Sequence, residues 1–174
     1  MKTTVYLLGH GSTELRPARA AFRRVEPRLT AAGRRQAAAT RDFLAVRPMD
    51  GCFASPMRPA LETAVIVAGP HCLTPQLLDA LTDADPNRET LPEVQVRAGA
   101  ALEELFRSRA GQTVLVVSHA NVIRAYLAGL LGLSANQGRQ LALDSCGISV
   151  VVRNGPRTAV STLNAAFHLQ GVAA

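Results

Sequence analysis

Two apolar stretches, each ending in a histidine, decide the fold of this chain: TVYLLGHG at residues 4–11 and TVLVVSHA at residues 113–120. Each is a short continuous apolar run, which is typical of a strand buried on both faces of a sheet. If the two strands are parallel neighbours, His10 and His119 emerge at the same carboxyl edge, where open α/β sheets bind their ligands. Two imidazoles together can supply a nucleophile and a charge stabiliser, or an acid and a base. We therefore expect the functional site at this pair.

The rest of the chain predicts an alternation of strands and helices. Further strands are expected at residues 51–54 and 72–78, the second as an edge or irregular strand because it contains a proline. Helices are expected from the N-cap Thr30 to near Pro48, and at residues 55–68, 93–109 and 121–131. A terminal hairpin follows, with strands at residues 147–152 and 157–163. This order predicts an α/β three-layer sandwich, with a mainly parallel central sheet, helices on both faces and a C-terminal β-hairpin, in one domain over residues 1–174.

Composition and charge exclude several classes of protein. No apolar run approaches the ~20 residues of a membrane span, and the N-terminus has no signal-peptide pattern, so we expect a cytoplasmic location and no membrane. The formal net charge is +6, but Lys2 is the only lysine and few aromatic residues are available to stack on bases. We therefore expect no nucleic-acid partner. Cys52, Cys72 and Cys146 are odd in number without metal-ligand spacing, which predicts buried free thiols and no metal or cofactor.

One local concentration of charge lies in the segment after His10. It contains five arginines: Arg16, Arg19, Arg23, Arg24 and Arg28. They form either a solvated basic loop or an anion-attracting rim above the site, and both interpretations stay open.

Four segments, in order, resemble the histidine phosphatase superfamily, also called the phosphoglycerate mutase-like superfamily. They are VYLLGHGST at residues 5–13, LTAAGRRQA at 29–37, SPMRPALETA at 55–64 and VVSH at 116–119. The resemblance implies that fold and a phosphoryl-transfer site. In the family the first histidine is transiently phosphorylated, the second histidine and two arginines hold the phosphoryl oxygens, and an acidic residue protonates the leaving group.

Carried over by position, the resemblance implies catalytic roles for His10 and His119, with Asp79 the best match for the acid. Asp83, Glu14 and Glu62 are further candidates for that acid. The sequence departs from the family at both arginines, which are here Gly9 and Pro59. The residues expected to contact substrate are Gly9, Gly11, Ser12, Thr13, Arg16, Arg58, Pro59 and Ala120. His71 and His168 match no family position and are expected to be ordinary surface residues.

Three functions are compatible with this pattern. The first, which we prefer, is a phosphohydrolase of a small phosphorylated metabolite that works through a phosphohistidine at His10. Its anion pocket would be rebuilt from Arg16, Arg58 and the backbone N–H groups of the helix after His119. The second is an enzyme using both histidines for acid/base chemistry (elimination, cyclisation or hydrolysis) on an uncharged metabolite. The third is a non-catalytic binding module. A small-molecule substrate is expected in the first two cases, and the sequence is compatible with a homodimer.

Overall fold

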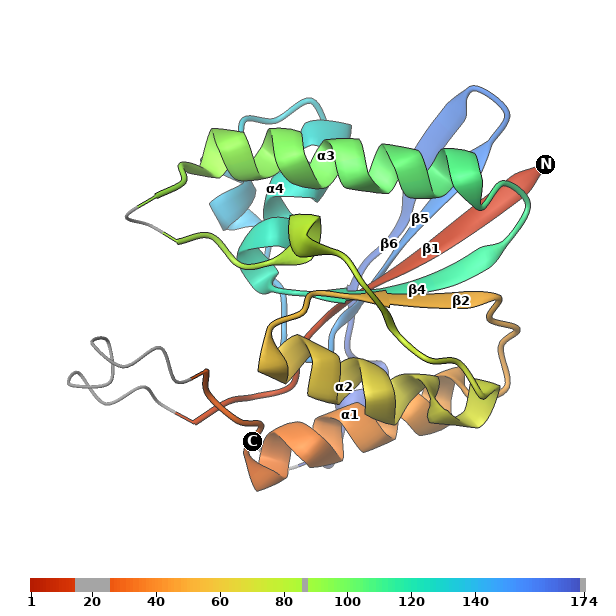
Figure 1. Ribbon diagram of the computed structural model, residues 1–174, viewed down its shortest axis with the longest axis vertical. Helices are drawn as coiled ribbons and strands as arrows, with labels where there is room; N and C mark the ends of the chain where they lie inside the picture. Colours follow the sequence, from red (N-terminus) through yellow and green to blue (C-terminus); the bar gives the residue numbers. More distant parts are fainter. Residues whose placement is uncertain (15–25, 86–87, 173–174) are drawn as a thin grey trace.

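The computed structural model describes residues 1–14, 26–85 and 88–172 (Figure 1). Six strands form one mixed sheet in the order β3-β2-β4-β1-β5-β6. The parallel part contains β3 (Gln76–Leu77), β2 (Gly51–Ala54), β4 (Thr113–Ser118) and β1 (Lys2–Gly9). The antiparallel hairpin of β5 (Ile148–Asn154) and β6 (Arg157–Ala165) extends the sheet beside β1. The expected three-layer α/β architecture is confirmed.

The helices cover the two faces of the sheet in pairs (Figure 1). On one face lie α1 (Ala31–Leu44) and α2 (Arg58–Ala68), and on the other lie α3 (Leu91–Ser108) and α4 (Ala120–Leu130). Short 3-10 turns occur at η2 (Gly69–His71), η3 (Asp79–Leu81), η4 (Gln137–Gln140) and η5 (Phe167–Leu169). No helix in the described ranges is long and apolar enough to cross a membrane.

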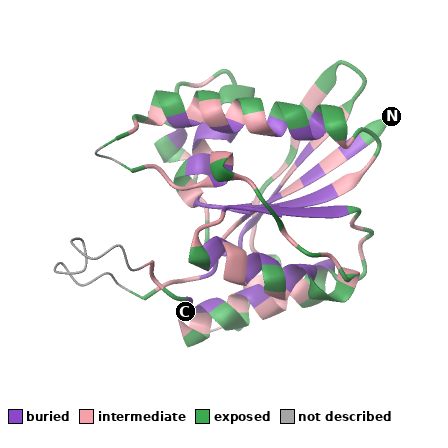
Figure 2. Cartoon of the chain, in the orientation of Figure 1, coloured by how far each residue is buried: buried purple, intermediate pink, exposed green. Residues whose placement is uncertain are grey.

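Alternate residues of the central strands fill two separate cores. Val5 of β1 and Val116 of β4 pack on the α3/α4 side, whereas Leu8 and Val117 pack on the α1/α2 side. Because successive side chains of a strand point to opposite faces, a strand buried on both sides needs an unbroken apolar run. Figure 2 shows β2 and β4 as an almost continuous buried band between the helices. The apolar runs that end in the two histidines are therefore required by the position of their strands.

The structure corrects several element boundaries. The strand expected at residues 72–78 shrinks to Gln76–Leu77, because η2 and a left-handed Cys72 (φ 54°) precede it. Cys72 is also exposed, contrary to expectation, whereas Cys52 and Cys146 are the expected buried free thiols. The helix expected from residue 55 begins at Arg58, because the Ser55 side chain accepts the Met57 N–H and so ends β2 in a tight turn.

Candidate active site

The register of β1 against β4 brings the two histidines together. Gly9 is paired with Ser118, so the residues that follow each strand are His10 and His119. The His10 N–H donates to the Ser118 carbonyl at 3.1 Å, which continues the ladder by one more bond. The imidazole centroids are 5.1 Å apart, with the ring planes at 68°. The expected pair is therefore a close edge-to-face contact at the carboxyl edge of the sheet.

The backbone determines which nitrogen of His10 carries a proton. Nδ1 lies 2.8 Å from the carbonyl oxygen of Gly11, which can only accept a hydrogen bond. Nδ1 therefore holds the proton, and the neutral ring keeps its lone pair on Nε2. This tautomer makes Nε2 the nucleophilic or basic atom of His10.

His119 is enclosed by protein. Its side chain is only 2 % exposed, and its Nε2 forms a 2.9 Å hydrogen bond with Ser55 Oγ, at the end of β2. Burial lowers the pKa of His119 to about 4; the Asp83 carboxylate opposes this shift, and the nearby His10 and Arg97 side chains add to it. His119 is thus a neutral imidazole near pH 7.

The segment after His10 lies directly on the N-terminus of α1. A Cβ on Gly33 would come within 2.1 Å of the Ser12 carbonyl oxygen, and a Cβ on Gly11 within 2.5 Å of the Gly33 carbonyl oxygen. Only glycine allows two backbones to approach this closely. Thr30 caps α1 as expected, because its side chain accepts the Gly33 N–H at 2.9 Å. The contact fixes the path of the chain beyond His10.

The two positions where the family resemblance implies arginine have different surroundings. A Cβ on Gly9 would meet only the Asp144 carbonyl oxygen, at an ordinary 3.6 Å. Pro59 is buried in the first turn of α2, and its carbonyl accepts the Thr63 hydroxyl at 2.7 Å. Thr63 Oγ1 in turn accepts the Gly11 N–H at 3.1 Å, which joins α2 to the segment after His10.

The other expected contact residues surround this core. Ser12 donates its N–H to Gln36 Oε1 at 2.9 Å, and Thr13 forms an isolated antiparallel bridge with Leu29. Ala120 is the first residue of α4, where N–H groups have no partner within the helix.

Arg58 is exposed at the start of α2, and its N–H binds the carboxylate of Glu26. Four members of the arginine cluster, including Arg16, lie outside the described residues, and Arg28 is exposed.

The four candidate acids differ in their relation to the histidines. Asp83 is half-buried, and its charge acts on His119; its Oδ1 accepts Asn121 Nδ2 at 3.3 Å. Asp79, the best match by sequence, is exposed at the start of η3, and its carboxylate bonds no other described residue. Glu62 is paired with Arg34, and Glu14 is exposed. Of the four, Asp83 is the carboxylate whose charge acts on His119 and which is bonded to α4 next to it.

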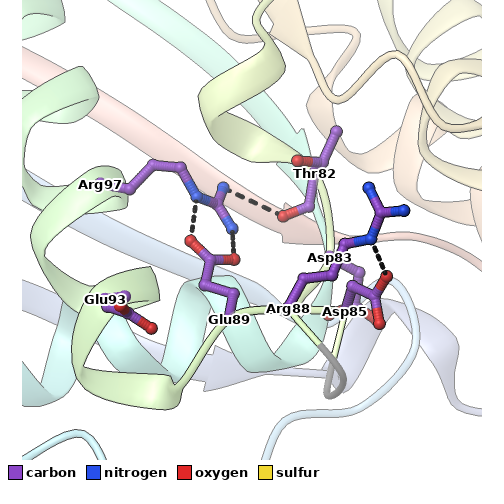
Figure 3. A pocket seen from close by; sticks show the side chains of 7 residues that line it. All are labelled: Thr82, Asp83, Asp85, Arg88, Glu89, Glu93 and Arg97. Atoms are coloured by element: carbon purple, nitrogen blue, oxygen red, sulfur yellow. Dashed lines mark hydrogen bonds and ion pairs between the residues drawn. The ribbon is translucent and has the colours of Figure 1, made fainter.

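A pocket of about 450 Å³ adjoins this carboxylate (Figure 3). Neither histidine lines it; its walls are polar and charged side chains of the segment before α3 and of α3 itself: Thr82, Asp83, Asp85, Arg88, Glu89, Glu93 and Arg97. Two ion pairs cross it, Arg97 with Glu89 and Arg88 with Asp85. In the described part of the chain no group of three or more His, Cys, Asp or Glu side chains could hold a metal.

Sequence reasoning singled out none of Ser55, Thr63, Asn121 and Arg97 as site residues. Ser55 begins a quoted motif and Thr63 is its penultimate residue, and Asn121 follows His119 by two residues, so those positions could have suggested them. Arg97 carries no local signal, because it reaches the site region from the middle of α3.

The structure is thus an open α/β sheet with a histidine pair at its carboxyl edge. Comparison with known proteins identifies the family. The family model described as the histidine phosphatase superfamily (branch 1) matches residues 5–88 and 79–166. The chain belongs to this superfamily.

Individual relatives are distant but match over most of their length. A probable phosphoglycerate mutase (GpmB) of Enterobacter sp. strain 638 is 28 % identical over 83 % of this chain and 82 % of its own. Among solved structures, YhfR of Bacillus stearothermophilus superposes with a TM-score of 0.84 at 22 % identity, over 96 % of this chain and 99 % of its own. A phosphoserine phosphatase of Entamoeba histolytica, in complex with 3-phosphoglyceric acid, gives 0.83 at 18 % identity with the same coverage.

Proposed function

We propose that this protein is a phosphohydrolase that acts on a small phosphorylated metabolite through a phosphohistidine at His10. The observation that carries the proposal is the hydrogen bond from His10 Nδ1 to the Gly11 carbonyl, which leaves a lone pair on Nε2 beside a second imidazole. The family assignment supports phosphatase-like activity. The names of the relatives, a mutase and a phosphatase of small phosphorylated acids, support this class of substrate.

The reaction has two steps. His10 Nε2 attacks phosphorus and forms a P–N bond as the P–O bond to the leaving group breaks, and a carboxylic acid gives its proton to the leaving oxygen. Water then attacks the phosphohistidine, the P–N bond breaks, and the water proton returns to the same carboxylate. We assign this role to Asp83 rather than to the sequence-favoured Asp79, because Asp83 acts on His119 and is tethered to α4 by Asn121.

The phosphoryl oxygens need donors in place of the family's two arginines. We propose that His119, the first N–H groups of α4 from Ala120 and the hydroxyls of Ser12 and Thr13 supply some of them, because a helix N-terminus favours anions. Arg58 at the start of α2 and Arg16 after the nucleophile supply positive charge. His119 is neutral in the free protein; a bound phosphoryl dianion would raise its pKa and so favour the charged, donating form.

Phosphate release from a panel of phosphomonoesters tests this function. The wild type is compared with His10→Ala, Arg16→Ala, Asp83→Asn and Asp79→Asn. We expect no turnover with His10→Ala, and a loss of about 10²–10³-fold with Arg16→Ala if that side chain stabilises the transition state. Asp83→Asn should cost much more than Asp79→Asn. His71→Gln, beyond the far end of α2, is the matched histidine control and should keep full activity.

The intermediate gives a direct readout. Wild-type protein mixed with a turned-over substrate and quenched in alkali should carry one phosphoryl group on the peptide that contains His10, and His10→Ala should carry none. Phosphate release that survives His10→Ala would overturn the mechanism, and absence of release from every phosphomonoester would overturn the function.

A second candidate is acid/base chemistry on an uncharged metabolite. Its supporting observation is the close pair of imidazoles, in which His10 keeps a lone pair on Nε2 and His119 is neutral near pH 7. The absence of positive charge at Gly9 and Pro59 also suits an uncharged ligand. This candidate predicts that uncharged metabolites, and not phosphate or phosphomonoesters, shift the NMR signals of both imidazoles. Phosphate binding at the histidines would exclude it.

A further inference from the structure

Arg97 has no place in the proposed chemistry, yet it holds the segment that carries Asp83. That segment runs from η3 to α3, and three consecutive carbonyls in it bind side chains of other elements. Arg97 Nη1 donates to the carbonyls of Ala80 at 2.7 Å and Thr82 at 3.2 Å, and Ser118 Oγ donates to that of Leu81 at 2.7 Å. Backbone without a regular ladder satisfies its polar groups in this way, so these donors set its path.

The other edge of the same guanidinium binds Glu89, which lies shortly before α3. Nε and Nη2 of Arg97 donate to the two carboxylate oxygens of Glu89 at 2.7 and 2.5 Å (Figure 3). Both side chains are largely shielded, with 24 % and 22 % exposed. The planar fork of arginine suits such a bidentate pair, and its remaining nitrogen reaches the two carbonyls. One side chain therefore fastens residues 80, 82 and 89 to the middle of α3.

Asp83 directly follows Thr82, whose carbonyl Arg97 binds. Its Oδ1 accepts the Ala84 N–H at 2.9 Å and the Asn121 amide at 3.3 Å, and Asn121 lies two residues after His119. The Asp83 N–H faces Met57 Sδ at 3.4 Å. These contacts around Asp83 are long or local, so the position of its carboxylate depends on the backbone that Arg97 and Ser118 hold.

We propose that Arg97 is a positioning residue, which holds residues 80–82 and Glu89 on α3 and thereby keeps the Asp83 carboxylate at the start of α4, next to His119. The inference rests on the proposed function, in which Asp83 moves the leaving-group proton. A lysine at position 97 would retain the charge but could not bind two carboxylate oxygens and two carbonyls at once. Loss of the guanidinium should therefore displace the Asp83 carboxylate even when the positive charge is kept.

Kinetics of Arg97→Lys test the role. Misplacing a catalytic group by about 1 Å can cost about 10²-fold in rate, so we expect kcat to fall about 10- to 100-fold with KM changed much less. In an Asp83→Asn background the same substitution should have almost no further effect, because the group that it positions is already gone. Arg107→Lys is the control: Arg107 is on the same helix and paired with Glu104, but exposed and distant in sequence from the segment. It should leave kcat unchanged.

A second measurement does not depend on turnover. Amide hydrogen exchange in residues 80–85 and the side-chain NMR signal of Asn121 should both change in Arg97→Lys and stay as in the wild type in Arg107→Lys. If the wild type releases no phosphate but these signals change, the proposed function fails while the anchoring stands. Unchanged exchange in Arg97→Lys, or kinetic losses that add fully to those of Asp83→Asn, would overturn the inference.

Discussion

Ser55 shows how one small side chain can connect two parts of a site. It is fully buried at the end of β2, where its Oγ accepts the Met57 N–H at 3.2 Å and bonds His119 Nε2 at 2.9 Å. The first contact shapes the turn into α2, and the second sets the orientation of the buried imidazole. A hydroxyl is suited to both because it donates once and accepts twice.

Ser55→Ala should therefore destabilise the protein and loosen His119. The Met57 N–H and His119 Nε2 would lose their partner inside the protein, which costs about 1–3 kcal/mol for a buried polar group. Urea unfolding measures this loss. Ser108→Ala, which removes an exposed hydroxyl bonded within α3, should change stability by less than about 0.5 kcal/mol. Equal stability of the two variants would show that the Ser55 bonds are not important to the fold.

At the scale of elements, the N-terminus of α1 packs closely against the residues that follow His10. Thr30 caps the helix and also donates from Oγ1 to the Ser12 carbonyl at 3.2 Å, while the Thr30 N–H donates to the same oxygen at 2.9 Å. Gly33 lies against that carbonyl in the first turn of the helix. The N-terminus of α1 thus acts as a rigid support for the residues after His10.

Alanine substitutions at two helical glycines distinguish the effect of close backbone contact from the effect of helix propensity on stability. Gly33→Ala would place a methyl group where the Ser12 carbonyl oxygen lies, and we expect a loss of about 1–3 kcal/mol from the backbone shift. Gly99→Ala in α3 meets nothing within 4 Å, so it should stabilise the protein by about 0.8–1.0 kcal/mol through propensity alone. Thermal unfolding should move in opposite directions for the two variants. A stabilised Gly33→Ala would contradict the packing described above.

At the scale of the whole molecule, two histidines fold in their neutral form. His119 is one, and His168 in η5 is the other: its Nε2 lies 2.9 Å from Thr40 Oγ1 and 3.1 Å from the Cys146 carbonyl. Its ring stacks on Phe43 of α1. Burial lowers the pKa of His168, as it does for His119. His168 is therefore not the surface residue that its sequence position suggests, but part of the contact that docks the C-terminal segment on α1.

The lowered pKa values of His119 and His168 predict how the stability of the fold depends on pH. Well above pH 6.5 both histidines are neutral in the folded and unfolded chains, so neither changes stability with pH there. As the pH falls from 6.5 towards about 4, the unfolded chain binds protons that the folded chain does not, and the free energy of unfolding decreases. Carboxylates with lowered pKa values, such as Glu93 and Glu103, add to the loss only below about pH 4.5.

Urea unfolding at several pH values checks this dependence. The decline between pH 6.5 and 4.5 should be shallower in His168→Gln than in the wild type, because one of the two groups is removed. A flat profile across this range in the wild type would contradict the burial of neutral histidines.

The amino-acid order alone was enough to predict the sheet, the four main helices and the closeness of His10 and His119 at one edge of the sheet. Unbroken apolar runs are needed for strands buried on both faces, and local signals such as Thr30 mark helix starts. The partners of the histidines were not accessible in this way. Ser55 reaches His119 across 64 residues, and Arg97 of α3 bonds the backbone before Asp83 across 17 residues. Such contacts have no periodicity or spacing in the chain, because they arise only when packing brings separate elements together, and burial then shifts the pKa of His119.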